Sequence, residues 1–118
     1  MNTLLSRIQE LILVCDSDER ELIEDMIIKA AAYVQAVTIM ETTARNYAGR
    51  SADDLREAVS STDKSRHNVH NSLISAVDIV NRICAMHGRP PLYTGSELRR
   101  EYGDFALALV TEVFTARG

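Results

Sequence analysis

The sequence predicts an all-α fold, a four-helix bundle built on a long antiparallel helical hairpin, in a single domain that spans residues 1–118. Apolar residues recur at spacings of three and four along most of the chain, which is the pattern of helices with one buried face. Gly49 and Gly88 each follow a long stretch of this pattern, and a glycine commonly ends a helix at such a point. Almost no segment alternates apolar and polar residues as a half-buried strand does.

The first predicted helix is short and amphipathic. Its apolar residues share one face, so the helix must pack against the rest of the chain; they are Leu4, Leu5, Ile8, Leu11 and Ile12. Asp16 or Ser17 can cap a second helix, whose first two turns carry acidic side chains that offset the positive end of the helix dipole. These acids are Asp18, Glu19, Glu21, Glu24 and Asp25.

The next two predicted helices are long. The second keeps its apolar spacing from Leu22 to Tyr47, just before Gly49. The third follows Ser51 as its cap and extends to Gly88. Because the turn around Gly49 is short, these two helices must run antiparallel as a hairpin.

Two features of the sequence bear on the continuity of the third helix and on where the fourth helix begins. Ser60–Thr62 contains poor helix formers, and the sequence leaves open whether the third helix continues through them, bends there or divides in two. A loop with two prolines follows at residues 89–95. The fourth helix is predicted to start at Ser96 and to stop at Gly118.

The lengths of the hairpin helices bear on oligomeric state. An unbroken helix of about 35 residues is roughly 50 Å long. A globular chain of this size has a radius of gyration of only about 13 Å. The long helices must therefore kink, or they protrude and are completed by a second copy. We favour protrusion and a homodimer, because a second copy covers the leftover apolar length most simply.

The hairpin also predicts which residues face one another. If the turn is centred near Arg50, the numbers of facing residues sum to about 100. By this sum, four pairs of residues lie at the same level of the two helices: Met26 and Ile74, Ala30 and His70, Tyr33 and His67, and Glu41 and Val59. It also brings Cys84 beside Cys15, which leaves open a disulfide or two thiols. A reducing cytosol favours the thiols.

Residues 62–88 combine helical spacing with a dense set of polar groups, and Arg66 is the first of them to need an explanation. Arg66 falls on an apolar stripe, so a buried guanidinium would need an anionic partner, for which Asp104 is the candidate. In this structural hypothesis Asn71 and Asn81 satisfy neighbouring polar groups. Arg66→Ala would then cost several kcal/mol by leaving a buried charge without its partner.

A metal site is the second hypothesis for this stretch. Asp63, His67 and His70 lie on one helical face at i, i+4 and i+7, and their side chains suit zinc, manganese or iron. Glu41 or Tyr33 would complete the ligand set from the second helix. The repeated Glu-x-x-His pairs of helical di-metal proteins are absent. A divalent cation is thus an open alternative, and no other cofactor is predicted.

A third hypothesis concerns Arg82 and His87. An arginine followed after four residues by a histidine resembles the motif of the HEPN helical ribonucleases and would imply an RNA-directed enzyme. Those motifs usually have a polar residue after the arginine, where this chain has Ile83. The simpler interpretation is that both side chains are cations favoured by the negative end of the helix dipole.

Charge and hydropathy indicate whether the chain is expected to bind nucleic acid or to contact a membrane. The net charge is −4, and residues 49–118 are balanced with nine acidic and nine basic side chains. Nucleic acid is therefore not expected as a partner, because neither half offers a basic face. No apolar run approaches the roughly 18 residues that cross a bilayer. Residues 11–15 are also too short an apolar run for the core of a signal peptide. We expect a cytoplasmic protein without membrane contact.

The order of motifs in residues 62–118 resembles a small all-helical bacterial family that carries only a domain-of-unknown-function label. The resemblance rests on the run RHNVHNSLISAVDIVNRI, a loop ending in Tyr-x-Gly, and Arg-x-x-x-Gly-Asp-Phe at 99–105. It implies a short helical cytoplasmic protein and no particular activity.

The sequence as a whole therefore favours a non-enzymatic interaction or scaffold module that forms a homodimer or binds another protein. The alternative is a metal-dependent or RNA-directed enzyme that uses the histidine groups above. The candidate binding residues are Tyr33, Glu41, Arg66, His67, His70, Asn71 and Asp104.

Overall fold

The computed structural model is all-α, as the sequence predicts. It describes residues 4–93 and 95–117, although not the side chains of Ser61 and of residues 95–104. Within these residues it contains four helices and no strand. The helices are α1 (Leu4–Val14), α2 (Ser17–Asn46), α3 (Ala52–Met86) and α4 (Gly95–Arg117).

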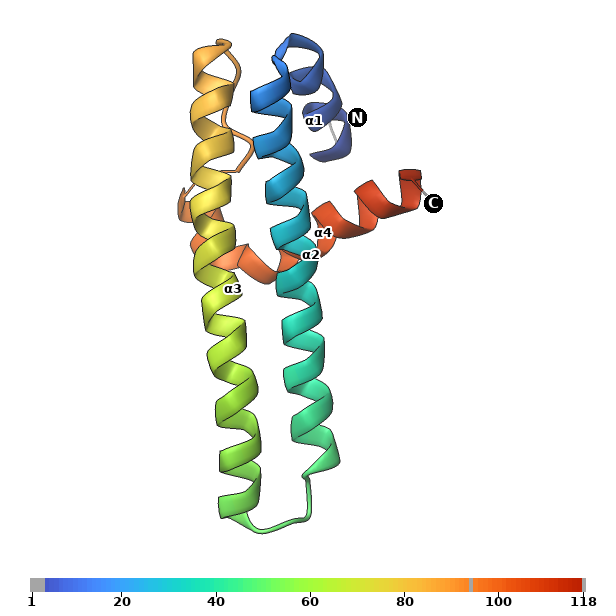
Figure 1. The fold of residues 1–118 in the computed structure, drawn as a ribbon, viewed down its shortest axis with the longest axis vertical. Coiled ribbons are helices and arrows are strands. Elements are labelled where there is room, and N and C mark those ends of the chain that lie inside the picture. Colours follow the sequence, from blue (N-terminus) through green and yellow to red (C-terminus); the bar gives the residue numbers. More distant parts are fainter. Residues whose placement is uncertain (1–3, 94, 118) are drawn as a thin grey trace.

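α2 and α3 form the predicted antiparallel hairpin and lie side by side along the length of the molecule (Figure 1). The turn between them contains Gly49 at φ +89°, a conformation that glycine adopts without strain. Ser51 caps α3 by accepting a hydrogen bond from the backbone N–H of Asp54 at 3.2 Å. α3 passes through residues 60–62 without a break. There the Thr62 hydroxyl donates to the carbonyl of Val59 at 3.0 Å, within the helix.

The hairpin protrudes instead of bending. The molecule measures 54 × 27 × 24 Å along its principal axes, and its radius of gyration is 16.5 Å. A compact chain of this length would have a radius of gyration of about 13.5 Å. The additional length is the end of the hairpin near the turn, where only two helices are present (Figure 1).

Among the described side chains, the buried residues of the core lie in the other half of the hairpin, where α1 and α4 pack. Its buried side chains on the hairpin are at residues 23–33 of α2 and 73–84 of α3. The largest are Ile8, Leu11, Ile23, Met26, Ile27, Leu73, Val77, Val80, Phe105 and Leu109. We call residues 34–72 the distal half of the hairpin, and none of the side chains described there is buried.

The arrangement departs from an aligned four-helix bundle, because α4 crosses the hairpin (Figure 1). Phe105 of α4 is buried in the core and contacts Tyr93, with ring centroids 4.5 Å apart. At the end of α4, Arg117 binds both carboxylate oxygens of Glu24 on α2, at 2.9 and 2.8 Å. α4 thus closes the core across the middle of the hairpin. It begins at Gly95, one residue before the predicted start.

Asn81 ties the prolyl loop to α3, which confirms the structural role predicted for this residue. Its side-chain N–H donates to the carbonyl of Tyr93 at 2.8 Å, and its side-chain oxygen accepts from the N–H of Leu92 at 2.9 Å. Cys15 and Cys84 are both buried free thiols, as expected. None of the helices in the described residues combines the length and apolar character needed to cross a membrane.

Candidate functional site

A polar cluster lies where the core meets the distal half of the hairpin. The ring of Tyr33 on α2 is 5.8 Å from the ring of His70 on α3, and His70 stacks with His67 at 6.4 Å. Tyr33 also interacts with the guanidinium of Arg66. The hairpin prediction that Tyr33 meets the polar groups of residues 66–71 is therefore confirmed. The facing ring is that of His70, one helical turn beyond the predicted His67.

Arg66 binds a residue of its own helix. Its Nε and Nη2 atoms both lie 2.9 Å from Oδ1 of Asp63. The side chains are 27% and 51% exposed, so the prediction of a buried Arg66 is wrong. The predicted partner, Asp104, lies outside the described side chains. For a partly exposed pair within one helix, Arg66→Ala should cost about 0–1 kcal/mol instead of several.

The structure separates the other candidate residues. Asp63 is engaged by Arg66, while His67 and Asn71 are exposed. Among the described residues, one group of three or more histidine, cysteine or acidic side chains brings its donor atoms within 4.8 Å of one another, and it does not include Asp63, His67 and His70. Glu41 is exposed and lines an open groove with Tyr33, Val37 and Leu107 of α4.

His70 should make stability depend on pH. Burial lowers the pKa of His70, and the nearby positive charge of Arg66 and the ring of His67 lower it further. Because the folded-state pKa lies below the unfolded value, the contribution of neutral His70 is complete above about pH 6.5 and is lost as pH falls through the folded-state pKa. We expect urea unfolding to show a larger loss of stability between pH 7.5 and pH 5 for wild type than for His70→Gln. His67→Gln is the control and should retain most of the wild-type loss.

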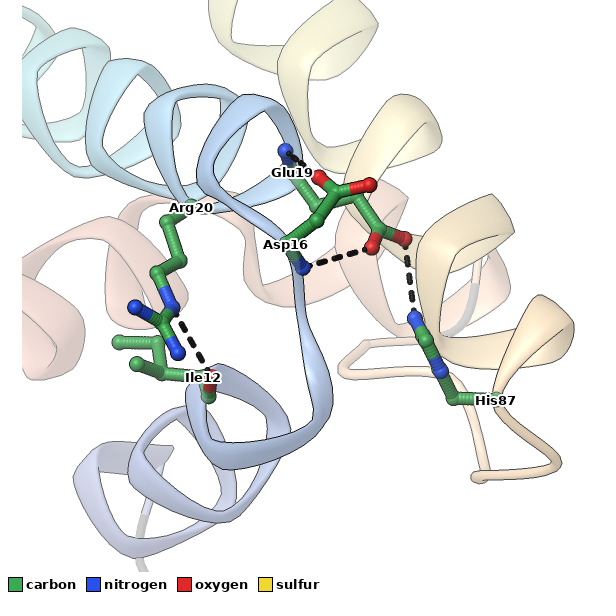
Figure 2. Close-up of polar contacts among 5 residues, drawn as sticks. All are labelled: Ile12, Asp16, Glu19, Arg20 and His87. Atoms are coloured by element: carbon green, nitrogen blue, oxygen red, sulfur yellow. Dashed lines mark hydrogen bonds and ion pairs between the residues drawn. The ribbon is translucent and has the colours of Figure 1, made fainter.

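A second cluster lies at the opposite end of the hairpin from the turn and begins with the cap of α2. The Asp16 side chain accepts from the backbone N–H of Glu19 at 2.8 Å, and the backbone N–H of Asp16 donates to Oε1 of Glu19 at 3.0 Å. This reciprocal capping box fixes the Glu19 carboxylate at the start of α2. Its other oxygen, Oε2, lies 2.9 Å from Nε2 of His87, the residue that caps the end of α3 (Figure 2).

Cys15 completes this second cluster from the link between α1 and α2. Its sulfur, a carboxylate oxygen of Glu19 and a ring nitrogen of His87 all lie within 4.8 Å of one another. Burial raises the pKa of the Cys15 thiol, and the negative charges of Glu19 and Asp16 raise it further. The hydrogen bond from the backbone N–H of Asp16 contributes most to holding the pKa of Glu19 below its usual value, and the hydrogen bond with the His87 side chain lowers this pKa further. The α1–α2 link, the first turn of α2 and the end of α3 thus meet at this polar cluster.

On sequence alone, the charged residues of this cluster are explained by helix dipoles and not by contact with one another. Glu19 was explained by the helix dipole of α2, and Arg82 and His87 by the opposite dipole at the end of α3. In the structure Arg82 is exposed, whereas His87 is turned toward Glu19. One signal did indicate the cluster: the predicted hairpin register brings Cys84 beside Cys15. The end of α3 was therefore expected close to the start of α2.

The chain was also compared with known proteins. A family model described as "Protein of unknown function (DUF3232)" matches residues 1–118. No curated protein and no solved structure matches the chain. The resemblance to a domain of unknown function is thus confirmed, and it extends over the whole chain and not only its second half.

Proposed function

The chain belongs to the DUF3232 family along residues 1–118, and because that description names no activity, we propose a function from the geometry alone. The protein is a helical interaction module that forms a homodimer through the distal half of its hairpin. One observation carries this proposal: the core ends at Tyr33 and Leu73, and none of the described side chains at residues 34–72 is buried.

The distal half has the apolar character of an unfinished helical bundle. Ile39 is 49% exposed, and several other apolar side chains are only partly covered: Val34, Val37, Met40, Ala44, Leu55, Ala58 and Val59. Two helices alone cannot bury an apolar stripe on each, because every helix in a bundle needs neighbours on two sides. A second hairpin would supply them.

We place the second copy on an open groove of the distal half. The groove lies near the turn, and its lining is mostly apolar, with Ala44 from α2 and Leu55 and Val59 from α3. The remaining lining residues are Ala52, Arg56, Ser60 and Asp63. Small and medium apolar side chains with polar residues at the edge suit a helix packed at close range.

Charge supports a second copy as the occupant. Residues 34–72 carry five acidic and five basic side chains, whereas the chain as a whole has a net charge of −4. The excess negative charge therefore lies outside the distal half. Two distal halves can pack together without net repulsion, and opposite charges at their edges can pair. A strongly acidic or basic partner would gain little from this surface.

The module is assigned to the cytoplasm. Both cysteines are free thiols, which suits a reducing compartment. An interaction with a different protein through the same groove is the competing outcome, and a monomeric wild-type protein would favour it.

Val59→Glu tests the proposed interface. A carboxylate at the centre of an apolar contact should weaken dimerisation by about 2 kcal/mol or more, which is roughly a 30-fold or larger rise in the dissociation constant. Sedimentation velocity over a range of concentrations measures it.

Ser65→Glu is the matched control, because Ser65 is exposed on the same helix and does not line the groove. It adds the same charge and should leave the dissociation constant unchanged. Helical content measured by circular dichroism checks that both variants fold. Equal dissociation constants for Val59→Glu and wild type would rule out this interface.

A further inference from the structure

Cys15, Glu19 and His87 form a cluster that the proposed dimerisation does not use. It lies at the end of the hairpin opposite the turn, while the dimer contact is in the distal half. The three residues come from the α1–α2 link, the first turn of α2 and the end of α3. A cluster with a thiol, a carboxylate and an imidazole within 4.8 Å of one another needs a chemical explanation. Of the described residues, no other three histidine, cysteine or acidic side chains meet in this way.

We propose that Cys15, Glu19 and His87 bind a zinc ion through three protein ligands, with the fourth tetrahedral position left for water or another small ligand. Cysteine sulfur, histidine nitrogen and carboxylate oxygen are the three donors that zinc takes in proteins. Magnesium and calcium prefer sets made of oxygen alone, so the thiol argues against them. One thiolate and one carboxylate also balance the charge of the divalent ion.

The His87–Glu19 pair requires little adjustment to admit the ion, and the Cys15 sulfur lies within 4.8 Å of both donor atoms. Nε2 of His87 and Oε2 of Glu19 are 2.9 Å apart, a distance that fits a shared proton. With zinc bonds of about 2.0–2.2 Å at tetrahedral angles, the same atoms would stand roughly 3.3–3.5 Å apart. The pair must therefore separate by about 0.5 Å, which a small rotation of either side chain provides. Zinc would then replace the proton between them.

The surroundings hold the ligands in position. The backbone N–H of Asp16 donates to Oε1 of Glu19, which leaves Oε2 available for the ion. The backbone N–H of His87 is bonded to the carbonyls of Ile83 and Cys84, so the end of α3 is fixed. Cys15 is only 6% exposed. A preformed set of this kind loses little conformational freedom when the ion binds.

Nearby positive charges do not occupy the cluster. Arg20 donates from Nε to the carbonyl of Ile12 at 3.2 Å, on the other side of Asp16 from His87 (Figure 2). Arg89 is paired with Glu10 at 3.5 Å. A bound zinc ion would therefore join the α1–α2 link to the end of α3 without displacing Arg20 or Arg89 from these contacts.

Cobalt titration tests the site, because cobalt takes tetrahedral zinc sites and a cobalt–thiolate bond produces a charge-transfer absorption band. The full chain is prepared without a polyhistidine tag and stripped with a chelator. We expect one cobalt ion per chain with the thiolate band, displacement by one equivalent of zinc, and a higher unfolding temperature with zinc. A wild-type protein without the thiolate band at saturating cobalt would overturn the proposal.

Matched variants identify the ligands. Cys15→Ser should abolish the thiolate band and weaken zinc binding at least tenfold, whereas Cys84→Ser, at the other buried thiol, should retain both. His87→Gln should likewise weaken zinc binding at least tenfold, and His67→Gln should not. Circular dichroism checks that each variant folds. If Cys15→Ser does not fold, the comparison of zinc affinity between His87→Gln and His67→Gln tests the assigned ligands instead. A band that persists in Cys15→Ser, or equal zinc affinity in the two histidine variants, would contradict the assignment.

Discussion

Phe105→Ala is expected to lower the free energy of unfolding by about 3–5 kcal/mol, the range measured for removing a buried aromatic ring. Phe105 of α4 is 2% exposed within the core, and its ring lies against that of Tyr93. Alanine would leave a cavity beneath α4 and remove the contact that holds the prolyl loop to this helix. Urea denaturation followed by circular dichroism measures the change.

Phe114→Ala is the matched control, because it removes the same side chain from the same helix. Phe114 is 46% exposed, so its replacement should cost much less, about 1 kcal/mol or below. If the two variants lost equal stability, α4 would not dock on the hairpin through Phe105, and the core described above would be wrong.

Asn81→Ala should cost about 2–3 kcal/mol, because it removes two hydrogen bonds at once. The backbone N–H of Leu92 and the carbonyl of Tyr93 would both lose their side-chain partner. Leu92 is 2% exposed, so water cannot easily replace the lost acceptor, and a buried donor without a partner costs about 1–3 kcal/mol. Thermal or urea unfolding of the variant measures the loss.

Asn71→Ala provides the comparison on the same helix, since Asn71 is exposed. Its replacement should change stability by no more than about 0.5 kcal/mol. Hydrogen exchange offers a second measurement, because the amide of Leu92 should exchange faster in Asn81→Ala and at the wild-type rate in Asn71→Ala. Unchanged exchange at Leu92 would show that Asn81 does not hold the loop.

The helical hairpin could be predicted from sequence because its determinants are local. Apolar spacing identifies the helices, and the glycine at residue 49 marks the turn between them. The course of α4 could not be predicted in this way. It depends on how the prolyl loop folds back and on the tertiary bonds of Asn81, and no periodic pattern records either. The crossing geometry is thus a property of packing and not of local propensity.

The register of the hairpin was predicted to within two helical turns, and part of the difference has a physical cause. Facing residues were expected to sum to about 100, yet Tyr33 meets His70 and Glu19 meets His87. Side chains lean toward the N-terminus of their own helix. In an antiparallel pair, contacting residues therefore lie further along both helices than residues at the same level. This lean raises the expected sum by about two, which accounts for most of the Tyr33–His70 difference but only part of the Glu19–His87 difference.

The interpretation of Arg66 failed for a different reason. Its position on an apolar stripe predicted burial and a distant acidic partner. The stripe continues into the distal half, where no third helix covers it, so Arg66 remains partly exposed and binds Asp63 one turn earlier. A helical pattern shows which face is apolar, but not whether anything packs on that face.

The molar mass of the wild-type protein is the most direct test of the central claim that a second copy covers the distal half of the hairpin. Sedimentation equilibrium at micromolar concentrations should give the mass of a dimer, about 26 kDa, twice the 13.1 kDa of the chain. A mass of 13.1 kDa at every concentration would contradict the homodimer and leave the groove of the distal half to a different protein.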